Sequence, residues 1–137
     1  MLSSASFAAG VVDAFGFLLA SGFTLVSASE ELVRFGSGAV AVAVVRDARL
    51  GEIDVFFVPA WDSERRRRYS IADVLTLEGI DADREHVPFQ VYAIGRARPF
   101  VEKLASWVRM HGQAALAGDR DYYERLDVEV VVAAAEA

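Results

Sequence analysis

The fold of this chain is decided by residues 32–58, which read LVRFGSGAVAVAVVRDARLGEIDVFFV. Valine, isoleucine and phenylalanine gather here into three runs, and such residues favour β-strands. The runs are separated by the short turn Gly36-Ser37-Gly38 and by a polar connection over residues 46–52. Connections this short join neighbouring strands in the antiparallel sense. We therefore expect an antiparallel meander with strands at residues 23–27, 32–35, 39–45 and 53–58.

The strand expected at residues 39–45 has two different faces, because successive side chains of a strand point to opposite sides. Valines occupy positions 40, 42 and 44, and alanines occupy positions 39, 41 and 43. Small side chains let a helix approach a sheet closely. We expect a helix to pack on the alanine face.

Helical patterns flank the strands on both sides. Apolar residues recur at helical spacing over residues 5–20, where Ser4 or Ser6 can cap the start and Gly22 can end the helix. A second helix is expected to begin after Ser70, which has Asp73 at capping-box spacing, and to end at Gly79.

The longest helix is expected over residues 98–117, with Pro99 in its first turn and Gly118 beyond its end. His111-Gly112 suggests a helix end or bend. Asp119 can then cap a short final helix that runs through Leu126. Of the adjacent tyrosines 122 and 123 in that helix, we expect one to pack and one to be exposed.

Strands grouped together with helices at both ends predict an α+β fold. The expected architecture is an N-terminal helix, an antiparallel meander of three to five strands, and two or three C-terminal helices packed on one face. Alternation over residues 87–91 allows one further strand. Residues 1–126 are expected to form a single domain, and residues 127–137 a tail that is either an edge strand or disordered.

Composition excludes several classes of function. The chain has no cysteine, so it has neither a thiol nucleophile nor a thiolate metal site. Its net charge of −6 argues against general nucleic-acid binding, because phosphate neutralisation supplies most of that affinity. Residues 5–26 carry the single charge Asp13 and follow no basic segment, which argues against a signal peptide or membrane span. We expect a cytoplasmic protein.

The sequence has no motif that predicts catalysis, a metal or a cofactor. Gly36, Gly38 and Ala41 match a dinucleotide-binding pattern by letter, but that pattern must open a helix, whereas a strand is expected here. His86 and His111 lack metal-ligand spacing. Residues 52 and 54, a glutamate and an aspartate, point to the same side of a strand, where a solvent-facing edge is favoured over a catalytic pair.

A run of arginines is the most distinctive feature. Arg65, Arg66, Arg67 and Arg68 stand between Trp61 and Tyr69. These six residues are our candidate partner-binding site, because guanidinium groups beside aromatic rings can hold acidic groups. The alternative is a solvated loop whose arginines balance nearby carboxylates.

Several stretches together resemble a loose group of small bacterial proteins of unknown or toxin-immunity type. They are Phe17-Leu18, Gly22-Phe23, residues 33–37, residues 52–55, residues 69–75, residues 116–119 and residues 123–126. The resemblance implies a single cytoplasmic domain that binds and blocks a cognate toxin without catalysis. The arginine run departs from the acidic binding face that such a protein would carry.

We therefore expect a non-catalytic protein-binding domain, an immunity-like inhibitor of a bacterial toxin. One alternative is an enzyme or small-ligand protein with a pocket between the sheet and the long helix, for which the candidates are Arg34, Trp61, Tyr69 and His111. Another is a structural or phage-type assembly protein.

Overall fold

A computed structural model describes residues 6–47, 49, 52–62, 68–80, 89–90 and 98–136 of the chain. In the described part, one sheet contains the strands β1 (Thr24–Ala28), β2 (Leu32–Gly36), β3 (Val40–Asp47), β4 (Glu52–Pro59), β5 (Tyr69–Ser70) and β6 (Phe89–Gln90). The strand order is β1-β2-β3-β4-β5, with β6 also paired to β4. All of these pairs are antiparallel, so the predicted meander is confirmed.

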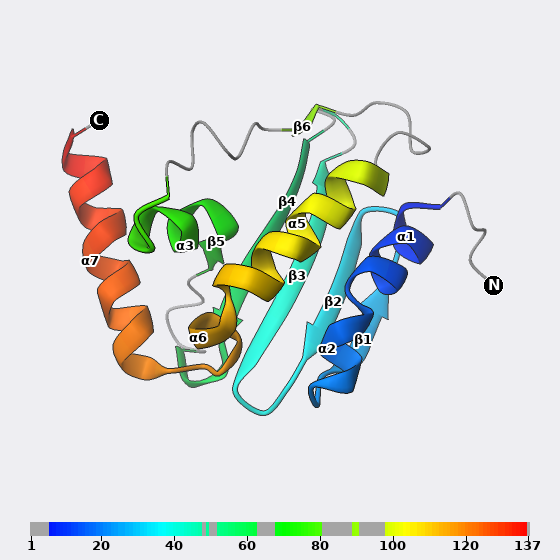
Figure 1. Ribbon diagram of the computed structural model, residues 1–137, viewed down its shortest axis with the longest axis horizontal. Helices are drawn as coiled ribbons and strands as arrows, with labels where there is room; N and C mark the ends of the chain where they lie inside the picture. Colours follow the sequence, from blue (N-terminus) through cyan, green and yellow to red (C-terminus); the bar gives the residue numbers. More distant parts are fainter. Residues whose placement is uncertain are drawn as a thin grey trace.

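The α-helices are α1 (Phe7–Ala14), α2 (Gly16–Ala20), α3 (Ile71–Leu77), α5 (Arg98–His111), α6 (Gln113–Leu116) and α7 (Arg120–Glu136), and a 3-10 turn, η1, spans Ala60–Asp62. Helices α1, α2, α3, α5 and α6 lie over one side of the sheet, while α7 stands beside α3 at the end of the molecule (Figure 1). The α+β class and the helices packed on one face are as predicted.

The core lies between these helices and the sheet. On β3 the valines at positions 40, 42 and 44 are buried, and on β4 the same side carries Val55 and Phe57. The prediction that a helix packs on the alanine face of β3 is therefore wrong. Branched side chains bury more apolar surface than alanine does, so the valine side is the one that the helices cover.

The first predicted helix is interrupted at Phe15. Ser6 caps α1 by accepting a 3.0 Å hydrogen bond from the backbone N–H of Ala9, but the helix ends at Ala14 and α2 begins at Gly16. Phe15 is fully buried, with its ring centroid 6.2 Å from that of Phe35 on β2. Gly22 follows α2 with a φ of 93°, the left-handed conformation expected at this helix end.

The long helix predicted over residues 98–117 is two helices, α5 and α6, which meet at Gly112. A Cβ atom at Gly112 would lie only 2.6 Å from the carbonyl oxygen of Val108, so the break requires glycine. Gly118 then turns the chain toward α7 with a φ of 69°, and a Cβ atom there would lie 2.7 Å from the Cβ of Ala39. The connection between α6 and α7 thus passes tightly over the start of β3.

The C-terminal residues 127–136 continue α7, whereas an edge strand or disorder is expected from the sequence. The acidic–apolar alternation that suggests a strand leads into a run of alanines, which are strong helix formers. Leu126 is fully buried and anchors the helix before that run. Tyr122 and Tyr123 are both buried, so the expectation that one of them is exposed is wrong.

Candidate functional site

The second side of the sheet is not covered by any described helix (Figure 1). Side chains on this side include Leu32, Arg34, Val45, Phe56 and Arg68, and we call this set the open face. They surround a shallow hollow of about 420 Å³. Apolar residues therefore line a solvent-facing surface and are bordered by guanidinium groups.

Strand register places these residues in rows. Arg34 on β2 is opposite Ala43 on β3, Ala43 is opposite Phe56 on β4, and Phe56 is opposite Ser70 on β5. The neighbouring row contains Leu32, Val45 and Asp54. Ala43, the smallest side chain of the first row, separates Arg34 from the ring of Phe56.

Arg34 and Arg68 lie on the open face, whereas Arg46 is paired with the buried Ile53 and lies on the helix side. The Arg68 guanidinium carbon lies 4.1 Å from the ring centroid of Phe56, a cation–π contact. Arg46 donates from Nη1 to the carbonyl oxygen of Glu30 at 3.3 Å, and its Nε is buried with no hydrogen-bond acceptor among the described residues. The Arg34 side chain is exposed and has neither a hydrogen bond nor an ion pair within the described part of the chain.

Two carboxylates accompany the arginines. Glu31 lines the hollow, and the Asp54 carboxylate accepts a 2.8 Å hydrogen bond from the backbone N–H of Val55. Glu52 and Asp54 do lie on the same side of β4, as the sequence predicts, and both are half-buried. In the described ranges, no group of three or more histidine, aspartate or glutamate side chains could hold a metal ion.

The six residues predicted as a partner-binding site are not all on one surface. Arg68 lies on the open face, whereas Trp61 and Tyr69 lie on the helix side, and residues 65–67 are outside the described part of the chain. Trp61 donates from Nε1 to the carbonyl oxygen of Gly118 at 3.3 Å, with the Arg120 guanidinium 4.7 Å from its ring centroid. A partner-binding role for this stretch stays a prediction, and of its described members Arg68 is the one on the open face.

Tyr69 belongs to a buried aromatic cluster that also contains Tyr122 and Tyr123. The hydroxyl of Tyr69 donates to Asp127 Oδ1 at 2.5 Å, and that of Tyr123 donates to the carbonyl oxygen of Ala115 at 2.7 Å. Burial, followed by the nearby Glu78 carboxylate, raises the pKa of Tyr122 to about 12. Burial, followed by its tyrosine neighbours, also raises the pKa of Tyr123. These contacts fasten α7 to β5 and α6, which is a structural role.

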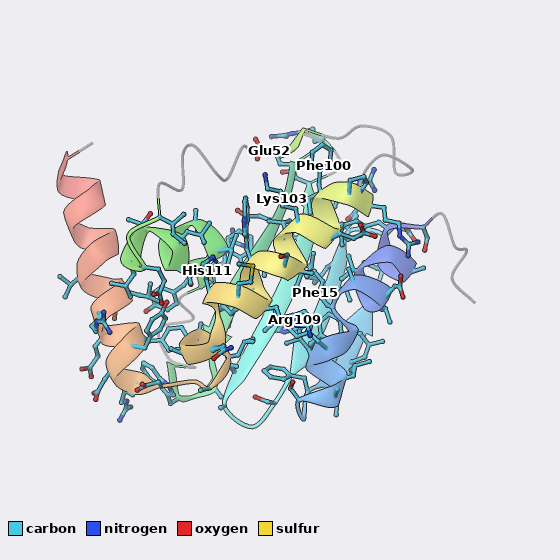
Figure 2. All side chains as sticks on the ribbon, viewed as in Figure 1. Phe15, Glu52, Phe100, Lys103, Arg109 and His111 are labelled. Atoms are coloured by element: carbon cyan, nitrogen blue, oxygen red, sulfur yellow. The ribbon has the colours of Figure 1, made fainter. Side chains whose placement is uncertain are left out.

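Of the four candidates for an enzymatic pocket, Trp61 and Tyr69 both contact the ring of Tyr123, whereas the other two lie elsewhere. Arg34 is on the open face, Tyr69 is in the aromatic cluster, and His111 is at the end of α5 (Figure 2). The space between the sheet and α5 is filled by residues with no exposed surface, namely Val42, Val44, Val55, Phe57, Leu104 and Val108.

A second hollow lies on the helix side, between α2 and α6. It has a volume of about 560 Å³, and its walls include Phe17, Phe23, Leu116 and Arg109. The Arg109 guanidinium carbon is 5.9 Å from the ring centroid of Phe17, and Figure 2 shows Arg109 on the side of α5 nearest α2. This groove has one charged side chain, whereas the open face has several.

Sequence reasoning missed Arg34 and Phe56 as members of one surface. The available signal was alternation, since the residues between the buried positions of each strand must share the opposite side. The Gly36-Ser37-Gly38 segment is a turn, as predicted. Ser37 Oγ accepts hydrogen bonds from the backbone N–H groups of residues 39 and 40, and β3 starts directly afterwards.

Comparisons with protein-family models, curated proteins and solved structures give no match. The resemblance to toxin-immunity proteins therefore has no support from them and stays a hypothesis. In the described ranges, every helix is too short or too polar to cross a membrane.

Proposed function

We propose that this chain is a non-catalytic protein-binding domain that uses its open face, and that it acts as an immunity-like inhibitor of a bacterial toxin. The observation that carries the proposal is the contrast between the sides of the sheet. One side is filled with helices, and the other presents apolar residues and two guanidinium groups without a described helix over them.

Exposed apolar surface has a free-energy cost that a partner would remove by burying it. The apolar area at the hollow comes from Leu32, Val45 and Phe56. The arginines around them can form directional hydrogen bonds that orient a partner. Arginine is enriched at protein interfaces together with aromatic residues. Inhibition of a toxin would then need only steric cover of its active surface, with association accelerated by complementary charge.

The test is co-expression of this chain with the product of the adjacent gene, with cell growth as the readout. Protection from a toxic neighbour is expected for the wild-type chain. Ala43→Lys places a long side chain over the hollow and is expected to abolish protection while the chain stays folded. Gln113→Lys introduces the same residue at an exposed position on α6 and is the matched control.

A neighbour that is not toxic, or a chain that gives no protection, contradicts the immunity role. Loss of protection in both lysine variants would argue against the open face as the binding surface. Near-ultraviolet circular dichroism of both purified variants shows whether a loss has a folding cause.

A further inference from the structure

We propose that the open face recognises an acidic segment of the partner, with carboxylates bound by Arg34 and Arg68 and apolar side chains seated beside Phe56. The inference deepens the proposed function and rests on it, because it assigns the chemistry of the protein that this surface would bind.

The arginines of the open face differ from Arg98 in their ion pairs. Elsewhere in the chain, Arg98 at the start of α5 forms ion pairs with Asp13 and Glu102. On the open face, by contrast, Arg34 has no carboxylate partner within the described residues, and Arg68 contacts the face of an aromatic ring. A guanidinium group stacked on a ring still presents its N–H edge, which can bind a carboxylate through two parallel hydrogen bonds.

Charge decides which macromolecule fits. The chain carries a net charge of −6, so a nucleic acid would be repelled by the molecule as a whole. A second copy placed symmetrically on this face would bring both arginine sets into one interface, which costs free energy. A protein segment with a few carboxylates carries less charge than a nucleic-acid backbone, and it can bring them to Arg34 and Arg68 while its apolar side chains enter the hollow.

The apolar hollow indicates that the ligand has apolar side chains as well as carboxylates. Ala43 leaves space between Arg34 and the Phe56 ring, and Leu32 and Val45 extend the apolar floor. An apolar side chain of the partner can be buried in this space while flanking aspartates or glutamates reach the guanidiniums. The expected ligand is therefore an acidic segment with aliphatic or aromatic residues among its carboxylates.

The experiment uses the full chain and a fluorescein-labelled synthetic peptide with leucine at every third position among glutamates. Fluorescence anisotropy should show binding that weakens as NaCl is raised, because exposed charge pairs are screened. A peptide with glutamine in place of each glutamate should bind roughly tenfold more weakly or worse. A labelled single-stranded DNA oligonucleotide should bind less tightly than the acidic peptide.

Single substitutions test whether the acidic peptide binds to the open face. Arg34→Gln and Arg68→Gln should each weaken the acidic peptide roughly tenfold, because each removes a charge-assisted contact. Arg109→Gln removes an exposed arginine from the helix side and should leave affinity unchanged. Circular dichroism should show that all of these variants fold, because their side chains lie outside the core.

Equal binding of the glutamate and glutamine peptides would overturn the proposal, as would tighter binding of DNA or wild-type affinity in an Arg34→Gln, Arg68→Gln double variant. Undiminished toxin protection in that double variant would overturn the acidic ligand and leave the proposed function standing. Arginine-dependent peptide binding without toxin protection would support the acidic ligand and contradict the immunity role.

Discussion

Strands β4 and β5 show how two neighbouring residues can serve different purposes. Phe57 and Tyr69 are paired across these strands and face the helices, and both are buried. Phe56 and Arg68, each one residue earlier, form a cation–π pair on the open face. The helix side therefore stabilises the fold, whereas the open face leaves hydrogen-bond donors available to a partner.

The polar groups of the two sides make the same distinction. On the helix side, the hydroxyls of Tyr69 and Tyr123 and the indole N–H of Trp61 each have an acceptor. On the open face, Arg34 forms neither a hydrogen bond nor an ion pair among the described residues. Its exposed donors are therefore available to a ligand.

The largest predicted effect comes from a matched pair of substitutions. Phe57→Ala removes a fully buried ring from the core and should lower the free energy of unfolding by roughly 3–5 kcal/mol. Phe56→Ala, one residue away on the open face, should lower it by about 1 kcal/mol, because its ring is half-buried and loses mainly the contact with Arg68. Urea unfolding followed by far-ultraviolet circular dichroism measures both.

Equal costs at the two positions would mean that the open face is packed as tightly as the core. That result would contradict the assignment of this surface to a partner. A larger cost at position 57 alone would confirm that consecutive residues of β4 have separate roles.

Alkaline pH should act on the buried tyrosines of the helix side. The pKa of Tyr122 is raised to about 12 and that of Tyr123 is raised as well, both chiefly by burial. The folded state therefore holds protons that the unfolded state releases above its ordinary tyrosine pKa of about 10. Stability from these groups is complete below pH about 10 and falls as pH rises from there through the folded-state pKa values.

Urea titrations across this pH range measure the effect. A Tyr122→Phe, Tyr123→Phe double variant should show a flatter dependence of unfolding free energy on pH, because the groups that titrate are gone. An unchanged slope in the double variant would assign the alkaline loss to other groups.

The sequence predicted the fold through residues whose chemistry has local consequences. Alternation over residues 39–45, the capping box of Ser70 and Asp73, and the left-handed glycines 22, 79 and 118 all have the expected roles. Helix continuity was harder to predict, because the breaks at Phe15 and Gly112 depend on tertiary contacts. A periodic apolar pattern persists through such a break.

The candidate site was less predictable for the same reason. Arg34 and Arg68 are far apart in the sequence and share one side of the sheet only through the register of β2 to β5. The arginine run and its flanking aromatic residues were predicted to form one binding site. Strand alternation instead directs Arg68 and Tyr69 to opposite sides of the sheet. Which face of β3 the helices would cover also depended on the whole sheet, and the sequence-based choice was wrong.

A smaller effect is expected at the hydrogen bond between the Tyr123 hydroxyl and the carbonyl oxygen of Ala115. Tyr123→Phe should lower the free energy of unfolding by about 1 kcal/mol, because that carbonyl also accepts from the backbone N–H of Gly118 and is not left without a donor. Thermal unfolding of the variant against wild type measures it. A loss above roughly 3 kcal/mol would show that the hydroxyl organises more of the aromatic cluster than this one bond.

The smallest effect on stability is expected at Arg34, where the effect on binding should be large. Arg34→Gln removes a side chain that makes neither a hydrogen bond nor an ion pair within the described residues, so the free energy of unfolding should change by less than about 0.5 kcal/mol. The same urea titration measures this change. A clear destabilisation would mean that Arg34 stabilises the fold. The open face would then not differ from the helix side in its role. An unchanged stability together with a weakened acidic ligand would place Arg34 among residues retained for binding.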